Sequence, residues 1–159
     1  MRRRSRRFGD QLTMKHFAIA LGLSLLLCNF SARAQENKPS ADDSTAIRTT
    51  VRDYIEAYYT GDAPRMQQTL HPHYLKHMIH GDADMRERTA AQMVGELRKN
   101  GVPTNIPAAD RTEQVTVLDI SGEIAEAKLV TPHWVDYMTL SKTEAGWKIL
   151  SVVQRMENW

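Results

Sequence analysis

The spacing of apolar residues along the chain changes near residue 111. Before this point apolar side chains recur every three or four residues, and after it apolar and polar residues alternate. In the segment 44–60 the first pattern predicts an amphipathic helix, with Asp43 or Ser44 as its cap and Gly61 at its end. The change of period predicts a helical first half and a stranded second half.

Two further helices are marked by their own capping residues. Asp62 is expected to cap a short helix that ends before His71. Thr89 opens a Thr-x-x-Gln capping box, and an apolar stripe follows it as far as Asn100 and Gly101. The first half of the chain is therefore predicted to hold three helices.

Four strands are predicted after residue 111, at residues 112–120, 123–131, 133–142 and 146–154. Turn residues separate them, and such short connections predict antiparallel neighbours. The predicted fold class is α+β, with a curved antiparallel sheet of four or more strands and three N-terminal helices packed across it. Helices that cover one side of a curved sheet leave a cone-shaped cavity between the layers.

The segment before the first helix has the layout of a secretory signal peptide. A basic start at Lys15 precedes an apolar run, residues 17–28, and small residues lead to Ala34. The run is shorter than the ~20 residues that a membrane-spanning helix needs. We therefore expect cleavage after Ala34, release into the periplasm or the medium, and no membrane anchor afterwards.

The export route and the start of translation each leave two alternatives. The pair Arg6-Arg7 fits a twin-arginine leader, whereas the long gap to the apolar run favours the general secretory route. Met1 and Met14 are both candidate starts. The predicted organisation is a leader over residues 1–34, a flexible tail over 35–43, and one domain over 44–159.

Removal of the leader reverses the sign of the net charge. Residues 1–34 hold seven of the 21 basic and one of the 19 acidic residues, which leaves 14 basic and 18 acidic residues and a formal charge of −4. A domain without a basic surplus lacks the electrostatic requirement of a nucleic-acid-binding surface, so no nucleic-acid partner is expected. Cys28, the one cysteine, leaves with the leader, so the mature chain has no disulfide. No cofactor is predicted.

The segment HPHYLKHMIH, residues 71–80, contains four histidines. A helix would place His73, His77 and His80 on one outward stripe, whereas a strand would place His73 and His77 on one side and His80 on the other. These three histidines are candidate zinc ligands, but their spacing matches no established zinc motif, so no metal is predicted. A metal site, a cavity edge for His73 and His77, and a structural role are the alternatives.

Asp136 and Tyr137, together with His77, are the candidate catalytic residues. A carboxylate in an apolar cavity can act as a general acid or base, and a tyrosine hydroxyl can donate to an oxyanion. Adjacent residues of a strand point to opposite faces, so at most one of the pair is expected to line a cavity. In the alternative interpretation Asp136 makes a structural hydrogen bond near the sheet edge and Tyr137 packs.

Four short motifs, in this order and spacing, carry a resemblance to a known family. They are Tyr58 with Gly61-Asp62, His71-Pro72, Asp136-Tyr137 with Leu140, and Gly146-Trp147-Lys148-Ile149. Over residues 46–155 the chain resembles the "putative lumazine-binding" branch of the nuclear transport factor 2-like (SnoaL-like) superfamily.

The resemblance implies a cone of curved sheet and three helices, a homodimer formed through the open sheet face, and a pocket. Relatives use this pocket for binding, isomerisation or dehydration, or not at all, and fold alone does not settle which. The expected pocket residues are Tyr54, Tyr58, His73, Trp134 and Trp147.

The leading functional prediction is an exported small-ligand-binding or accessory protein, whose ligand is small and apolar or aromatic. One alternative is an isomerase or dehydratase that uses Asp136 or His77 with a tyrosine. Such an enzyme needs these groups to converge in one cavity. The other alternative is a structural homodimeric module whose interior is filled by large apolar side chains.

Overall fold

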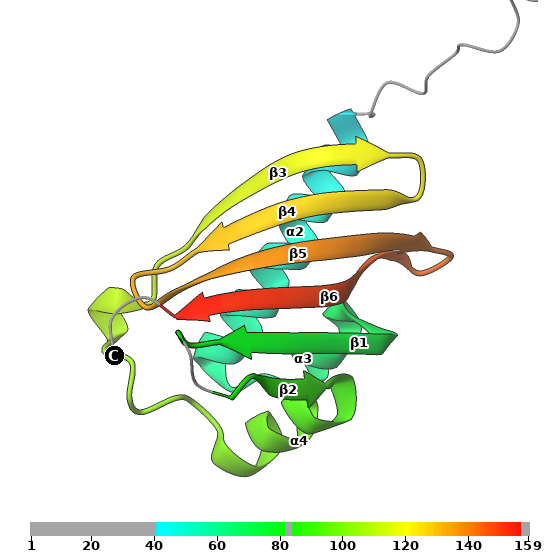
Figure 1. Ribbon diagram of the computed structural model, residues 1–159. Coiled ribbons are helices and arrows are strands. Elements are labelled where there is room, and N and C mark those ends of the chain that lie inside the picture. The colour runs from blue at the N-terminus through cyan, green and yellow to red at the C-terminus, as the bar shows by residue number, and fades with distance from the viewer. Residues whose placement is uncertain (1–40, 82–83, 157–159) are drawn as a thin grey trace, which may run out of the picture. The chain divides into compact units, whose positions relative to one another are not determined.

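The structure, a computed structural model, describes residues 41–81 and 84–156 (Figure 1). The predicted signal peptide, its cleavage site and residues 35–40 of the predicted tail lie outside the described residues. Within the described ranges, no helix is both long and apolar enough to cross a membrane.

Three helices match the three predicted from the capping residues. They are α2 (Ala41–Thr60), α3 (Ala63–Thr69) and α4 (Ala90–Asn100). Asp62 Oδ1 accepts the backbone N–H of Arg65 at 2.9 Å and caps α3, and the predicted capping box is present at the start of α4. The first helix begins at Ala41, before the predicted start at residue 44.

Six strands form one sheet in the order β2-β1-β6-β5-β4-β3. The strands are β1 (Leu70–Ile79), β2 (Arg86–Thr89), β3 (Gln114–Ser121), β4 (Ile124–Val130), β5 (Trp134–Thr143) and β6 (Gly146–Met156). The last four are the predicted strands, and each pairs with the next in antiparallel fashion. The predicted α+β class is confirmed.

The histidine-rich segment is strand β1, so its helical alternative is wrong. Strand β1 pairs with β2 in antiparallel fashion and with β6 in parallel fashion, so the sheet is mixed and not antiparallel throughout as predicted. A parallel pair needs a long crossover, and here the chain from β2 to β5 supplies it.

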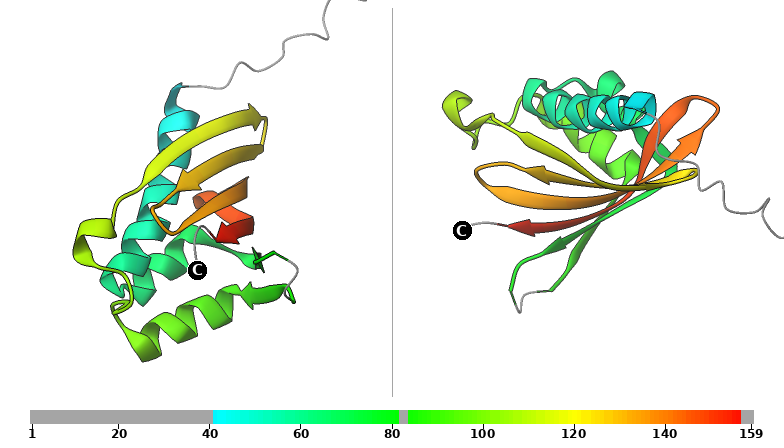
Figure 2. Two further views of the ribbon diagram at one scale, coloured as in Figure 1. Left: turned by 60° about the vertical axis from the view of Figure 1, so that its left-hand side comes forward. Right: turned by 90° about the horizontal axis from the view of Figure 1, so that it is seen from above.

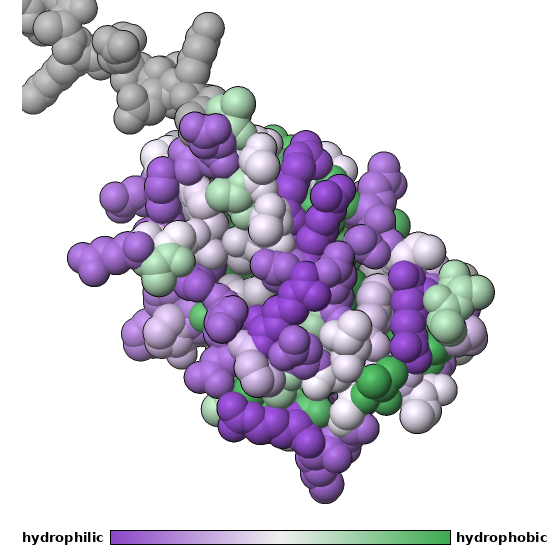
Figure 3. Space-filling model, turned by 180° about the vertical axis from the view of Figure 1, so that it is seen from behind, coloured by the Kyte–Doolittle hydropathy of each residue, from purple (hydrophilic) through white to green (hydrophobic). Residues whose placement is uncertain are grey.

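The helices lie on one face of the sheet, which curls towards them without closing (Figures 1 and 2). Helix α2 presents Ile47, Val51 and Ile55 to the sheet, and all three are fully buried. They belong to one core cluster with the inward residues of β4, β5 and β6. The helix-covered side of the domain has a mainly hydrophilic surface (Figure 3).

The segment between α4 and β3 is tied to the end of α2 by one arginine. The Arg111 guanidinium donates to the carbonyl oxygens of Tyr59 at 3.3 Å, Pro103 at 3.0 Å and Ile106 at 3.2 Å. A short 3₁₀ helix, η1 (Ala108–Asp110), precedes this arginine. These contacts fix the position of Ile106, which is buried in the core cluster.

Candidate functional site

A cavity of about 530 Å³ lies between the helices and the concave face of the sheet. Its lining comes from α2, β1, β2, α4 and residues 105–106, together with the start of β5 and the end of β6. A cavity of this size accommodates a small organic molecule. This cavity corresponds to the cone-shaped cavity that the predicted fold places between the helices and the sheet.

Aromatic and flexible apolar side chains form the walls. The rings of Tyr58 and Trp134 meet edge to face, with centroids 5.8 Å apart and an interplanar angle of 89°. Met78, Met93 and Met156 line the cavity with them. Unbranched methionine side chains adjust to irregular ligand shapes, so these walls can fit more than one outline.

A buried lysine forms part of the floor. Strand alternation places Lys76 on the concave face between Tyr74 and Met78, where it is only 5% exposed. Its Nζ donates to Tyr54 Oη at 3.1 Å, and Tyr54 Oη lies 3.5 Å from Tyr74 Oη. The lysine Nζ also lies 3.4 Å from Asp136 Oδ1. This floor is therefore a chain of polar groups below apolar walls.

Asp136 is fully buried behind the lysine and does not itself line the cavity. Burial raises the pKa of its carboxyl group above the usual value, while Lys76, Gln154 and Trp134 beside it oppose the rise. Within the described part of the chain, neither carboxylate oxygen has a partner with full hydrogen-bond geometry, and neither does Trp134 Nε1. Buried polar groups are nearly always satisfied, so this end of the core has unused hydrogen-bonding capacity.

The tyrosine hydroxyls around the floor are donors near neutral pH. Burial raises the pKa of Tyr54, Tyr58 and Tyr74 above the ordinary value, so all three stay protonated. Tyr54 and Tyr58 are four residues apart on α2 and therefore share one face of the helix. Both line the cavity.

Charged side chains surround the mouth of the cavity. Arg88 Nε pairs with Glu96 Oε1 at 2.7 Å and links β2 to α4. His80, Asp84 and Arg86 also line this end and are exposed. Solvent and ligands therefore reach the apolar interior through a polar rim.

The structure brings only part of the predicted pocket together. Three of the five expected residues line the cavity, namely Tyr54, Tyr58 and Trp134. His73 is exposed on the outer face of β1, where its backbone N–H donates to His71 Nδ1 at 3.1 Å. Trp147 is buried at the opposite end of β5 and β6, where its Nε1 donates to Asp43 Oδ1 at 2.9 Å. Strand alternation turns His73 to the outer face, and Trp147 lies at the far end of its strand, so neither residue lines the cavity.

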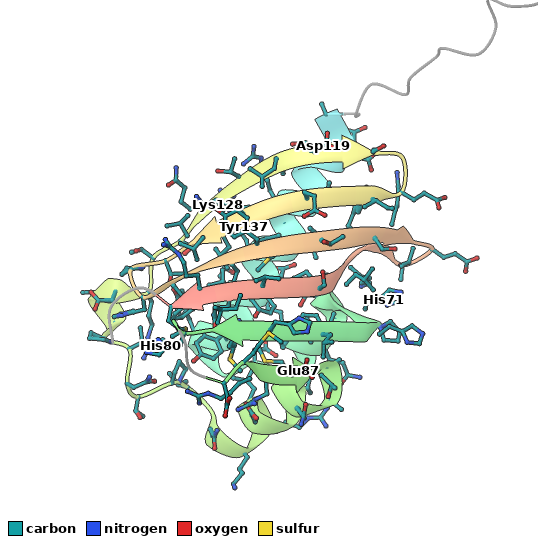
Figure 4. The ribbon with its side chains drawn as sticks, in the orientation of Figure 1. His71, His80, Glu87, Asp119, Lys128 and Tyr137 are labelled. Atoms are coloured by element: carbon teal, nitrogen blue, oxygen red, sulfur yellow. The ribbon has the colours of Figure 1, made fainter. Side chains whose placement is uncertain are left out.

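The predicted catalytic residues do not converge. Asp136 faces the core, whereas Tyr137 is 48% exposed on the outer face, where Lys128 Nζ lies 5.4 Å from its ring centroid (Figure 4). The prediction that these neighbours point to opposite faces is confirmed. His77 is also on the outer face, and its Nε2 lies 3.1 Å from Glu87 Oε1.

The three candidate zinc ligands are divided between the two faces of the sheet. His80 lines the cavity mouth, whereas His73 and His77 lie on the outer side of β1. Among residues 41–81 and 84–156, no three histidine, cysteine, aspartate or glutamate side chains are placed to hold a metal ion.

Two buried polar residues of the cavity lining, Lys76 and Gln154, were not among the predicted ones. Both are charged or polar side chains on strands, and both are at least nine-tenths buried. The available signal was the strand alternation of residues 74–80, which places Lys76 on the same side as Tyr74 and Met78. A lysine that shares a strand face with apolar residues is a candidate for burial at a cavity.

The family of the chain follows from a match over most of the described domain. Residues 42–154 match the family described as "Putative lumazine-binding", which is more than half of the chain. The protein belongs to this family, and the resemblance inferred from the four motifs is confirmed. No curated protein matches the sequence.

Solved structures of low sequence identity share the fold. An NTF2-like protein of unknown function from Shewanella baltica OS155 has a TM-score of 0.62 and 16% identity, covering 77% of this chain and 100% of its own. An NTF2-like protein of unknown function from Methylobacillus flagellatus KT has a TM-score of 0.61 and 20% identity, covering 76% and 97%. A ketosteroid isomerase-like protein from Erwinia carotovora atroseptica SCRI1043 has a TM-score of 0.56 and 10% identity, covering 76% and 100%. Together these neighbours identify the NTF2-like fold.

Proposed function

We propose that this protein is an exported small-molecule-binding protein whose ligand occupies the cavity between α2, α4 and the sheet. One observation carries the proposal: a cavity of about 530 Å³ combines aromatic and methionine walls with a buried polar floor. Such a combination is typical of ligand sites, in which apolar contact supplies affinity and a few polar groups supply orientation. The leader layout of residues 14–34 supports export.

Native mass spectrometry of the protein purified from its own cells tests this function. A stoichiometric organic mass that is lost on denaturation is the expected result. Lumazine, which the family description names, is the first compound to add to protein stripped of ligand. Protein that carries no organic mass, and that gains no thermal stability from lumazine or any other small aromatic compound, contradicts the proposal.

An isomerase or dehydratase is the second candidate, supported by the buried Asp136 with its raised pKa and by the neighbour named for ketosteroid isomerase. The geometry favours binding over catalysis, because Lys76 lines the cavity and this carboxylate, 3.4 Å from the lysine Nζ, does not. His77 and Tyr137 lie on the other face of the sheet. The enzyme would be favoured if the protein exchanges protons of a bound ketone with solvent and if Asp136→Asn abolishes this exchange.

We also propose that the protein forms a homodimer through the outer sheet face. One row of paired residues crosses this face: Lys128, Tyr137, Val153, His77 and Glu87. Its centre is exposed and partly apolar, and its ends are basic and acidic. A two-fold axis through Val153 along the strands would bring Lys128 of each copy to Glu87 of the other, so the row is self-complementary. Figure 4 shows Lys128 and Glu87 on strands at opposite sides of the sheet.

Sedimentation analysis of charge variants tests this dimer. Lys128→Glu and Glu87→Lys are each expected to weaken it, and the double variant is expected to restore it. A wild-type protein that stays monomeric at all concentrations, or single variants that dimerise normally, would contradict this interface. The row of charges is outside the cavity, so ligand binding by the monomer is expected to survive.

A further inference from the structure

We propose that the cavity recognises its ligand through an acceptor oxygen, a carbonyl or a carboxylate, which Lys76 Nζ and Tyr58 Oη bind at the buried end. This inference rests on the proposed binding function and specifies the chemical class of the ligand. The remainder of that ligand is a small apolar group with an aromatic ring.

The Lys76 ammonium has one donor more than its contacts use. An ammonium carries three N–H donors. One faces Tyr54 Oη at 3.1 Å and a second faces Asp136 Oδ1 at 3.4 Å. In the described part of the chain no third acceptor accompanies them, although the residue is 5% exposed and lines the cavity. A buried donor without an acceptor is costly, so the site is completed by an oxygen that enters the cavity.

Tyr58 supplies the second donor. The Tyr54 hydroxyl is already engaged on two sides, because it accepts from Lys76 at 3.1 Å and lies 3.5 Å from Tyr74 Oη, a contact in which either hydroxyl can donate. The Tyr58 hydroxyl, one helical turn later, has no hydrogen-bond partner among the described residues. Tyr58 also lies within electrostatic reach of Lys76, which opposes the burial-induced rise of its pKa. Two unused donors therefore face the same cavity.

Among the described residues, no carboxylate lines the floor of the cavity. The Asp136 carboxylate is fully buried behind the ammonium and does not line the cavity. A ligand ammonium would meet the like charge of Lys76, which disfavours cations at this end. The two acids that line the cavity are Asp84 and Glu96, which belong to the charged rim. An oxygen acceptor therefore fits the floor, and an amine does not.

The walls determine the rest of the ligand. Tyr58 and Trp134 present aromatic surface, and three methionines complete an adaptable apolar wall. An aromatic ring stacks or packs edge to face against such rings, with its polar group turned to the floor.

Calorimetric titration of two matched probe pairs tests the proposal on protein purified from cells that express the full-length gene. Acetophenone and ethylbenzene differ in the carbonyl oxygen, and benzoate and benzylamine differ in the sign of the charge. Acetophenone is expected to bind about tenfold more tightly than ethylbenzene, and benzoate more tightly than benzylamine by at least that factor.

Variants assign the preference to the two donors. Tyr58→Phe is expected to lower the acetophenone-to-ethylbenzene preference several-fold and to leave ethylbenzene binding unchanged. Lys76→Met leaves Asp136 unpaired and endangers folding, so the double variant Lys76→Met/Asp136→Asn provides the second test. In the double variant acetophenone is expected to bind about as tightly as ethylbenzene, as two apolar probes of equal size would.

The outcomes separate the ligand class from the binding function. If ethylbenzene and benzylamine bind the wild type as tightly as their oxygen-bearing partners, the cavity binds ligands but the inferred class is wrong. A preference that survives in both variants also overturns the role of the two donors. If no probe binds and no ligand accompanies the purified protein, the binding function itself is contradicted, and the inference falls with it.

Discussion

A tryptophan, a lysine and an aspartate meet at each end of the sheet, but the hydrogen bonds among them differ between the two ends. At the closed end, Trp147 Nε1 and Lys142 Nζ both donate to Asp43 Oδ1, at 2.9 and 2.8 Å. At the cavity end, Trp134 and Lys76 flank Asp136, with the lysine at 3.4 Å.

The two tryptophans are almost equally buried, at 4% and 6% exposure. Their indole nitrogens differ, because Nε1 of Trp134 lies beside Asp136 without full hydrogen-bond geometry, whereas Nε1 of Trp147 donates to Asp43 at 2.9 Å. Burial alone therefore does not distinguish a structural cluster from a ligand site. The completeness of the hydrogen bonds does, because a closed cluster has no capacity left for a ligand.

The largest expected effect comes from breaking each lysine–aspartate pair in turn. Lys76→Met strands a buried carboxylate and is expected to lower the free energy of unfolding by about 3–5 kcal/mol. Lys142→Met removes a pair in which the lysine side chain is 46% exposed, so a loss of about 0–1 kcal/mol is expected. Urea denaturation of both variants measures the difference. Equal losses would show that the two clusters are energetically alike.

The cavity wall provides the next test. Gly61 has a φ of +72°, and a Cβ at this position would lie 2.8 Å from Gly101 C and Val102 N. Gly61→Ala is therefore expected to cost about 2–3 kcal/mol and to displace the segment that carries Ile106. Gly122, with a φ of +59° and open space around its Cβ position, is the control, and Gly122→Ala is expected to cost about 1 kcal/mol. Thermal unfolding that ranks them in the opposite order would argue against a tight contact at Gly61.

Tryptophan-to-phenylalanine changes compare the indole nitrogens directly. Trp147→Phe removes a hydrogen bond to a carboxylate and is expected to cost about 1–2 kcal/mol. Trp134 Nε1 lies beside Asp136 without full hydrogen-bond geometry, so Trp134→Phe is expected to cost less, below about 1 kcal/mol. Ligand affinity is expected to change in Trp134→Phe and to stay the same in Trp147→Phe. The reverse pattern would locate the binding site at the closed end.

The smallest effect is a pH dependence that belongs to the cavity end. Burial raises the pKa of Asp136 in the folded state above its unfolded value of 3.8, so folding takes up a proton there. The stability that this group contributes is complete below the unfolded pKa and is lost as pH rises through the folded pKa. The wild type should therefore lose stability relative to Asp136→Asn as pH rises from 4 towards neutrality. Denaturation of both proteins across this range measures the slope, and a wild type that gains stability relative to Asp136→Asn as pH rises would contradict it.

Much of the fold was predictable because its determinants are local. Asp62, Thr89 and Gly101 cap helices through contacts within a few residues, and the strand period of residues 112–154 is visible in the sequence. The pairing of β1 with β6 was not predictable, since it joins segments nearly eighty residues apart and leaves no local pattern. The same pairing places the histidine segment, whose conformation the sequence left open, as a strand between β2 and β6.

The site was less predictable than the fold for a related reason. Aromatic residues such as Tyr54, Tyr58 and Trp134 are natural pocket candidates, and their positions on α2 and β5 bear this out. Lys76 was hidden because lysine is nearly always exposed, and its burial depends on a carboxylate sixty residues away. The histidines drew attention by number, whereas position on the strand decided which of them faces the cavity.

The parallel pair also sets the order in which the domain can assemble. Strand β6 lies in the middle of the sheet between β1 and β5, yet it is the last strand of the chain. A ribosome releases β1 long before β6, so the sheet has no centre until translation of the domain is complete. The central pairing of the sheet is therefore the last to form, after every other strand has left the ribosome.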